Sequence, residues 1–215
     1  MVQQSSPAAL LFTAPGCPHC PGVKASLEKL LAEGVIASLE VHSMVEAQVR
    51  AAELGVRSVP WLQLGEFVLT GAQTPQELRQ WAEPTEPRGM SGYLEHLLLN
   101  GELNEAETLL QRQPQHLSAL LPLLGAEDTP IQVRLGISAI VEALEGSEAL
   151  RELLPELLRL SSDTDHRVRS DACHFLGLSH QREALPALRT RLSDMHSEVR
   201  EIAAEAIELI EEQTA

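Results

Sequence analysis

The sequence predicts a small α/β domain followed by an all-α domain of helical repeats, and three observations support this fold class. Short apolar runs alternate with helical patterns as far as about residue 81, whereas the later segments all show helical periodicity. A motif with one Asp and one Val-Arg pair recurs three times in the second half. Aromatic residues make up only 3% of the chain, which favours cores in which Leu, Val, Ile and Ala side chains pack between helices.

The first domain is predicted to begin with a strand, a helix and a second strand. Residues 8–13 form a short apolar run bounded by Pro15 and Gly16, and that length suits a buried strand. Residues 35–42 are expected to form the second strand, and residues 45–54 a short helix. Between the two strands a helical pattern runs up to Gly34, and its apolar face consists of Val23, Leu27, Leu30 and Leu31.

A hairpin and a capped helix complete this domain, which we assign to residues 1–83. The segments VRSVPWLQL and FVLT are separated by Gly65-Glu66, which predicts a β-hairpin. Thr74, Pro75 and Glu77 then supply the cap, the first position and the capping-box partner of a helix.

The second domain is assigned to residues 91–215, after a Pro- and Gly-rich linker over residues 84–90. An irregular helix pair is expected over residues 91–113, with its turn at Asn100-Gly101. Three more regular helix pairs follow, and each opens its first helix with a Leu-Pro pair: Leu121-Pro122, Leu154-Pro155 and Leu185-Pro186.

In each of these three pairs, an Asp precedes a Val-Arg pair by five residues. The three sets are Asp128 with Val133-Arg134, Asp163 with Val168-Arg169, and Asp194 with Val199-Arg200. The Val residues are spaced by 35 and 31 positions, a period typical of a two-helix solenoid repeat. We expect each Asp to cap the second helix of its pair. The pattern resembles HEAT repeats over about residues 115–213, which implies that each repeat buries its apolar face against the next.

The net charge of −15 is concentrated in the second domain. Residues 1–85 hold 5 basic and 8 acidic side chains and carry −3 of it, so the remainder carries −12. An acidic protein repels phosphate backbones and anionic lipids, so we expect no nucleic-acid partner and no membrane partner. The N-terminal residues lack the pattern of a signal peptide and no apolar stretch reaches about 18 residues, so a cytoplasmic location is expected.

Cys17-Pro18-His19-Cys20 is the motif most specific for chemistry. It lies between a predicted strand and a predicted helix, so the N–H groups and the positive dipole end of that helix point at the first sulfur. This environment lowers the pKa of a thiol, and a thiolate both attacks disulfides and leaves readily. We therefore predict that Cys17 is the nucleophile and Cys20 the resolving thiol. Pro18 and His19 form the active-site loop, and His19 either adds positive potential near Cys17 or is an ordinary loop residue.

With this motif, residues 8–83 resemble the thioredoxin superfamily, which implies a thioredoxin fold and thiol–disulfide exchange. The segment AELGVRSVP, which ends at Pro60, is similar to the family segment that ends in a cis-proline. The resemblance thus implies a cis Val59–Pro60 bond that presents the Val59 backbone to a substrate strand. Gly71, before the last helix, matches a position where family members approach the active site closely with backbone.

Two features of the resemblance leave the chemistry open in detail. Pro18-His19 is the pair found in the DsbA family, whereas Cys20-Pro21 resembles compact glutaredoxin-like sites, so the direction of electron transfer is not decided. The first strand also lacks the buried carboxylate that relays protons in thioredoxins. Water or Glu40 are the substitutes that the sequence offers as proton acceptors for Cys20.

Metal binding is the main alternative chemistry for the two cysteines. Tetrahedral zinc takes four ligands, and the sequence has no second C-x-x-C and no nearby His pair, so we expect no metal and no other cofactor. Transport of a soft metal such as Cu(I) is a weaker alternative. Cys173 falls at the small-residue position that Ala203 fills in the next repeat, and we expect it to be a buried structural thiol.

Two functional hypotheses follow from these observations. In the first, the protein is a thiol–disulfide oxidoreductase that acts on a protein disulfide or dithiol, and the helical repeats dock that substrate or another, unidentified protein partner. In the second, the protein is an interaction scaffold whose C-x-x-C pair is a redox switch or a relic.

Overall fold

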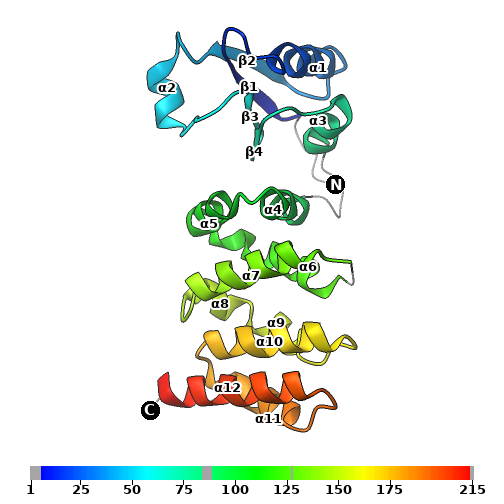
Figure 1. Ribbon diagram of the computed structural model, residues 1–215, viewed down its shortest axis with the longest axis vertical. Coiled ribbons are helices and arrows are strands. Elements are labelled where there is room, and N and C mark those ends of the chain that lie inside the picture. Colours follow the sequence, from blue (N-terminus) through cyan, green and yellow to red (C-terminus); the bar gives the residue numbers. More distant parts are fainter. Residues whose placement is uncertain (1–5, 84–88, 127, 214–215) are drawn as a thin grey trace. The chain divides into compact units, whose positions relative to one another are not determined.

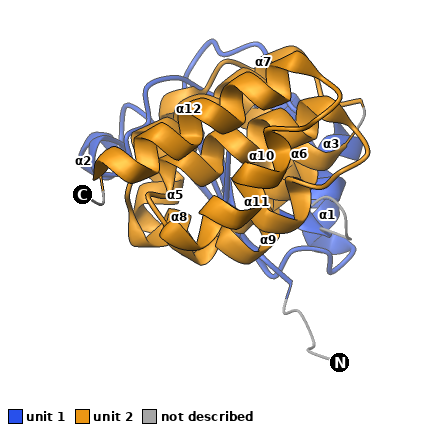
Figure 2. Cartoon of the chain, turned by 90° about the horizontal axis from the view of Figure 1, so that it is seen from below, with its two compact units in different colours: residues 1–89 blue, residues 90–215 orange. Residues whose placement is uncertain are grey.

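The structure is a computed structural model that describes residues 6–83, 89–126 and 128–213. The chain divides into two compact units, residues 1–89 and residues 90–215 (Figure 2). The first unit holds all the strands of the described residues, and the second is helical, so the predicted fold class is confirmed. Most of the linker predicted over residues 84–90 lies outside the described residues.

Residues 6–83 of the first unit form four strands in the spatial order β2-β1-β3-β4, with three helices around them (Figure 1). β1 pairs in parallel with β2 and antiparallel with β3, and β3 forms the predicted hairpin with β4. The elements are β1 (Ala8–Thr13), α1 (Cys20–Ala32), β2 (Ser38–Ser43), α2 (Gln48–Glu53), β3 (Trp61–Leu64), β4 (Phe67–Thr70) and α3 (Pro75–Ala82).

The central strand β1 buries apolar side chains on both faces, which explains its continuous apolar sequence. Phe12 packs on one face in a cluster with Ala51, Val56 and Trp61, and Ala51 belongs to α2. Leu11 points to the opposite face because strand side chains alternate, and it is fully buried there. α1 and α3 pack against each other on the side away from α2 (Figure 1). The sheet is thus covered on both faces, and the redox motif follows the C-terminal end of β1.

All the regular elements within residues 90–126 and 128–213 of the second unit are helices. The predicted irregular pair over residues 91–113 is confirmed as α4 and α5, and three further pairs follow it. The elements are α4 (Met90–Leu99), α5 (Leu103–Arg112), the 3₁₀ helix η1 (Pro114–Leu120), α6 (Leu121–Gly125), α7 (Ile131–Ala143), α8 (Glu148–Glu152), α9 (Leu154–Leu160), α10 (His166–Leu178), the 3₁₀ helix η2 (Arg182–Ala184), α11 (Leu185–Arg191) and α12 (Ser197–Gln213).

The three repeats share a broken first helix and a continuous second helix. The first helix of each repeat is split into two pieces, and Pro122, Pro155 and Pro186 stand near the start of the second piece. A proline there lacks an N–H that would have no helical partner anyway, so it begins the new piece without cost. The second helices α7, α10 and α12 stack in order (Figure 1). The Val residues of the repeat motif are at most 1% exposed, as predicted.

The prediction that the repeat Asp residues cap the second helices is wrong for α7 and α10. The N-cap of α7 is Pro130, and the N-cap of α10 is Asp165, whose carboxylate accepts from the N–H of Arg167. Asp163 and Asp194 instead accept from the backbone N–H two residues further on, at 2.9 and 3.1 Å. These bonds shape the turn that precedes the helix.

Asp194 has a second role, because it binds Arg169 of the preceding repeat. The Arg169 guanidinium donates to both carboxylate oxygens of Asp194 at 2.8 Å, and also to the carbonyls of Asp163 and Thr164. The two side chains are only 8% and 4% exposed. This buried pair therefore joins the turns of two successive repeats. Among the described residues, every helix is too short or too polar to cross a membrane.

Candidate active site

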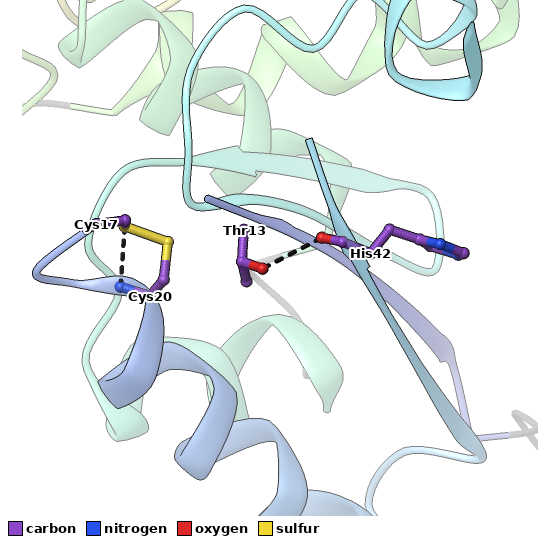
Figure 3. Close-up of a disulfide and its surroundings, with 4 residues drawn as sticks. All are labelled: Thr13, Cys17, Cys20 and His42. Atoms are coloured by element: carbon purple, nitrogen blue, oxygen red, sulfur yellow. Dashed lines mark hydrogen bonds between the residues drawn. A yellow bond between two sulfur atoms is a disulfide. The ribbon is translucent and has the colours of Figure 1, made fainter. Parts of the chain in front are cut away.

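The redox motif lies between the end of β1 and the start of α1. β1 ends at Thr13 and α1 begins at Cys20, so Cys17, Pro18 and His19 belong to the connecting loop. Cys17 and Cys20 form a disulfide whose Cα atoms are 5.6 Å apart (Figure 3). Cys17 is half-buried, whereas Cys20 is only 4% exposed. Cys17 is therefore the more accessible of the two cysteines.

The Cys17 sulfur faces the first turn of α1. The N–H of Cys20 donates to Cys17 Sγ at 3.1 Å, and the N–H of Cys17 donates to the Ala14 carbonyl at 3.2 Å, which closes the loop. The first turn of α1 contains no acidic residue that would offset the positive end of the helix dipole. This arrangement stabilises negative charge on Cys17 when the disulfide is reduced.

The two residues between the cysteines are exposed. His19 is the N-cap of α1 through its backbone, because its carbonyl accepts from the N–H of Val23 at 3.2 Å, and its side chain makes no capping hydrogen bond. Pro18 precedes it, and Pro21 follows Cys20 in the first turn, where its missing N–H does not interrupt the helix. The loop thus exposes a rigid proline and an imidazole beside Cys17.

The Val59–Pro60 peptide bond is cis, as the family resemblance implied. Pro60 directly precedes β3, whose antiparallel pairing with β1 sets Trp61 opposite Phe12. Continued by one residue, this register sets Pro60 opposite Thr13, at the end of β1 from which the Cys17 loop departs. Val59 is half-buried and Pro60 is buried.

Gly71 lies at the same end of the sheet, next to the C-terminal end of β1. Its N–H donates to the Pro60 carbonyl at 2.9 Å, and its φ of 76° is a conformation that glycine adopts without strain. The fold therefore places Gly71 and the cis-proline at the end of the sheet from which the cysteine loop departs.

Thr13 is a polar residue at this end of the sheet that the sequence patterns did not single out. Its Oγ1 donates to the His42 carbonyl at 3.2 Å, and its own carbonyl accepts from the N–H of Met44 at 2.8 Å (Figure 3). These two bonds fasten the end of β1 to the end of β2 directly before the redox loop. A hydroxyl residue that ends an apolar run just before a C-x-x-C loop is the signal that could have identified it.

Glu40, one of the two acceptors suggested for the Cys20 proton, lies on the α2 face of the sheet. Its carboxylate accepts from Arg50 of α2 at 3.1 Å and lies 3.4 Å from His42 Nε2. The hydrogen bond to His42 and the nearby Arg50 guanidinium hold the pKa of Glu40 below its ordinary value. Leu10, which is opposite Glu40 in the sheet, packs against the cluster that contains Ala51 of α2. Glu40 thus faces away from α1 and from Cys20 at its start.

Cys173 is the third cysteine and lies in α10. It is fully buried, and burial raises the pKa of its thiol to about 12. The prediction of a buried structural thiol is confirmed. Across the described ranges, no group of three or more His, Cys, Asp or Glu side chains could hold a metal ion.

Comparison with known proteins finds matches in both units. A family model for a thioredoxin domain matches residues 10–83, and one for HEAT repeats matches residues 117–208. A thioredoxin of Methanocaldococcus jannaschii is 36% identical over 70 residues, which are 32% of this chain and 82% of that protein. Both resemblances stated from the sequence are therefore confirmed.

Proposed function

The chain belongs to the thioredoxin family through its first unit and carries HEAT repeats in its second, and on this basis we propose that it is a thiol–disulfide oxidoreductase. The observation that supports the proposal most is the Cys17–Cys20 disulfide itself. It lies at the N-terminus of α1 and pairs a partly accessible sulfur with a buried one. Such a pair can exchange with a substrate disulfide at Cys17 while Cys20 stays shielded.

In the reducing direction, the Cys17 thiolate attacks one sulfur of the substrate disulfide. The substrate S–S bond breaks, one substrate thiolate leaves, and the other sulfur is held in a mixed disulfide with Cys17. Cys20 then gives its proton to water and attacks the Cys17 sulfur, which forms the Cys17–Cys20 disulfide and releases the second substrate thiolate. The substrate gains two electrons and the enzyme loses two. A dithiol donor restores the pair by the same steps in reverse.

In this proposal, Val59, Pro60 and Gly71 bind the substrate strand. Val59 lies shortly before β3, at the end of the sheet where the redox loop lies, so its backbone can pair with an extended segment. Gly71 is exposed and has no side chain, so a substrate backbone can approach it closely.

We further propose that the HEAT repeats dock the protein substrate or a second protein. Stacked repeats offer an extended surface, and a tethered docking surface raises the effective concentration of the redox site at its substrate. The match of residues 117–208 to HEAT repeats supports this part of the proposal.

The variant Cys20→Ser tests the redox proposal, because it removes the thiol that completes the second step. With insulin as the disulfide substrate, we expect a mixed disulfide at Cys17 to accumulate, visible by mass spectrometry and cleaved by dithiothreitol. The matched control is Cys17→Ser/Cys20→Ser, which should form no adduct. If Cys20→Ser forms no more adduct than this control, the proposed function is wrong.

The alternative function, an interaction scaffold, is separable by the same double variant. A scaffold binds its partner equally well with Cys17→Ser/Cys20→Ser, and a redox switch binds it in only one oxidation state. An oxidoreductase instead loses its activity while the HEAT repeats keep their binding.

A further inference from the structure

Strand β2 forms one edge of the sheet, and no other strand within residues 6–83 pairs with its outer side. It is six residues long, with the sequence SLEVHS, and none of its residues is fully buried. Natural edge strands often carry proline or charged side chains, lysine above all, which prevent pairing with another strand. β2 has neither proline nor lysine, and its one carboxylate is that of Glu40. An open edge of this kind is a template for an additional strand.

The register of β1 and β2 shows which backbone groups of β2 are available. Thr13 pairs with Ser43, and its carbonyl accepts from the N–H of Met44. In a parallel ladder, a residue bonds to the two neighbours of the residue opposite, so His42 and Met44 turn their backbone groups toward β1. The residues between them in the alternation therefore direct backbone groups outward: both groups of Leu39 and Val41, and the N–H of Ser43. The Ser43 carbonyl already accepts from the N–H groups of Glu46 and Ala47, at 3.1 and 2.9 Å.

Charge selects one register for the pairing of β2 with a second copy of itself. If the two-fold axis passes through Glu40, two carboxylates face each other, which is destabilising. If it passes through Val41, then Glu40 faces His42 of the second copy on both sides of the axis. Arg50 Nη1 lies 3.1 Å from both the Glu40 carboxylate and His42 Nε2, so each Glu40 also meets a permanent positive charge.

We propose that two copies of this chain associate through β2, which pairs antiparallel with itself about Val41 and joins the two sheets. The outward groups of Val41, the Leu39 carbonyl and the Ser43 N–H then form about four hydrogen bonds between the copies. The two β2 strands point in opposite directions, so the two redox loops lie at opposite ends of the joined sheet. The association therefore does not depend on the proposed redox function.

The variant Val41→Pro tests this proposal, because it removes the outward N–H at the centre of the interface. Proline is tolerated on an edge strand where the N–H faces solvent, so the monomer should keep its fold. A six-residue strand makes a small interface, so we expect sedimentation equilibrium to give a wild-type dimer with a Kd between about 1 µM and about 1 mM. Val41→Pro should stay monomeric, whereas Val41→Ala, which keeps the N–H, should still dimerise.

Far-UV circular dichroism and disulfide reductase activity show whether Val41→Pro is folded, and a second variant decides if it is not. Glu40→Lys places a positive charge against His42 and Arg50 of the second copy, so the dimer should weaken by at least about tenfold. Glu53→Lys makes the same charge change outside the strand and should leave the Kd unchanged. A wild-type chain that is monomeric up to about 1 mM overturns the proposal. So does a dimer that forms as readily with Glu40→Lys or with a folded Val41→Pro.

Discussion

Replacing Cys17 by serine is expected to lower the rate of disulfide reduction by at least about 1,000-fold, because a serine hydroxyl cannot form the mixed disulfide. The loss should be in the chemical step, since the substitution leaves the backbone of the loop and the start of α1 in place. The measurement is turnover of insulin disulfides with dithiothreitol as the electron donor.

Cys173→Ala is the matched control for this experiment. The position is fully buried, and the next repeat already carries Ala203 in the corresponding place. We expect its turnover to equal that of the wild type. Retained turnover in Cys17→Ser would show that Cys17 is not the nucleophile. Lost turnover in a folded Cys173→Ala would contradict the structural role assigned to Cys173.

Asp194→Ala is expected to lower the free energy of unfolding of the HEAT repeats by about 3–5 kcal/mol, because it leaves a buried guanidinium without its partner. Arg169, 8% exposed, loses both of its bonds to the carboxylate, and the N–H of His196 loses its acceptor. Denaturation followed by far-UV circular dichroism measures the helical repeats. Trp61 and Trp81 both belong to the first unit, so their fluorescence reports the other unit and should change little.

The same carboxylate predicts a loss of stability in acid. The hydrogen bond from Arg169 is the main cause that lowers the pKa of Asp194 from 3.8 to about 2. A depressed pKa in the folded state means that the stabilisation is complete above the unfolded pKa of about 4 and is lost as the pH falls toward 2. The wild type should therefore lose more stability than Asp194→Ala across this interval.

Asp165→Ala is the matched control, since it removes a carboxylate from the preceding repeat without leaving a buried charge unpaired. Asp165 caps α10, and its ion-pair partner Arg167 is 48% exposed. The expected loss is about 1 kcal/mol, typical of an N-cap. Equal losses for the two variants would contradict the role assigned to the buried pair.

The features that the sequence predicted well are those encoded locally. The capping box of α3 is present as expected: Thr74 Oγ1 accepts from the N–H of Glu77, and the Glu77 carboxylate accepts from the N–H of Thr74. α2 and β2 both begin later than predicted, at Gln48 and Ser38. For β2 the reason is that residues 35–37 form the bend that follows α1, which ends at Ala32. Val35 N–H donates to the Leu30 carbonyl at 2.9 Å, and Ile36 is buried at 1% exposure.

The repeat motif contains contacts that the local sequence does not determine. Asp163 and Asp165 are both good capping residues, and only the structure shows that Asp165 takes the N-cap. The bond from Arg169 to Asp194 spans 25 residues and depends on how successive repeats stack, so no short pattern predicts it.

In the candidate site, too, some features follow from the local sequence and others depend on the fold. The cysteine pair could be predicted because its two members lie within one loop and one helical turn. The cis bond at Pro60 came from the family resemblance alone. The bond from Thr13 to His42 spans 29 residues, and the face on which Glu40 lies depends on the strand register, so both required the structure.

The reduction potential of the Cys17–Cys20 pair, measured in glutathione buffers with Cys173 replaced by alanine, tests the central claim most directly. We expect a reversible two-electron couple with a midpoint between about −270 mV and about −120 mV, the range of thiol–disulfide oxidoreductases. A value near the lower end identifies a reductant, and one near the upper end an oxidant. A pair that never forms the disulfide, or that stays oxidised at every glutathione ratio, would contradict the redox function.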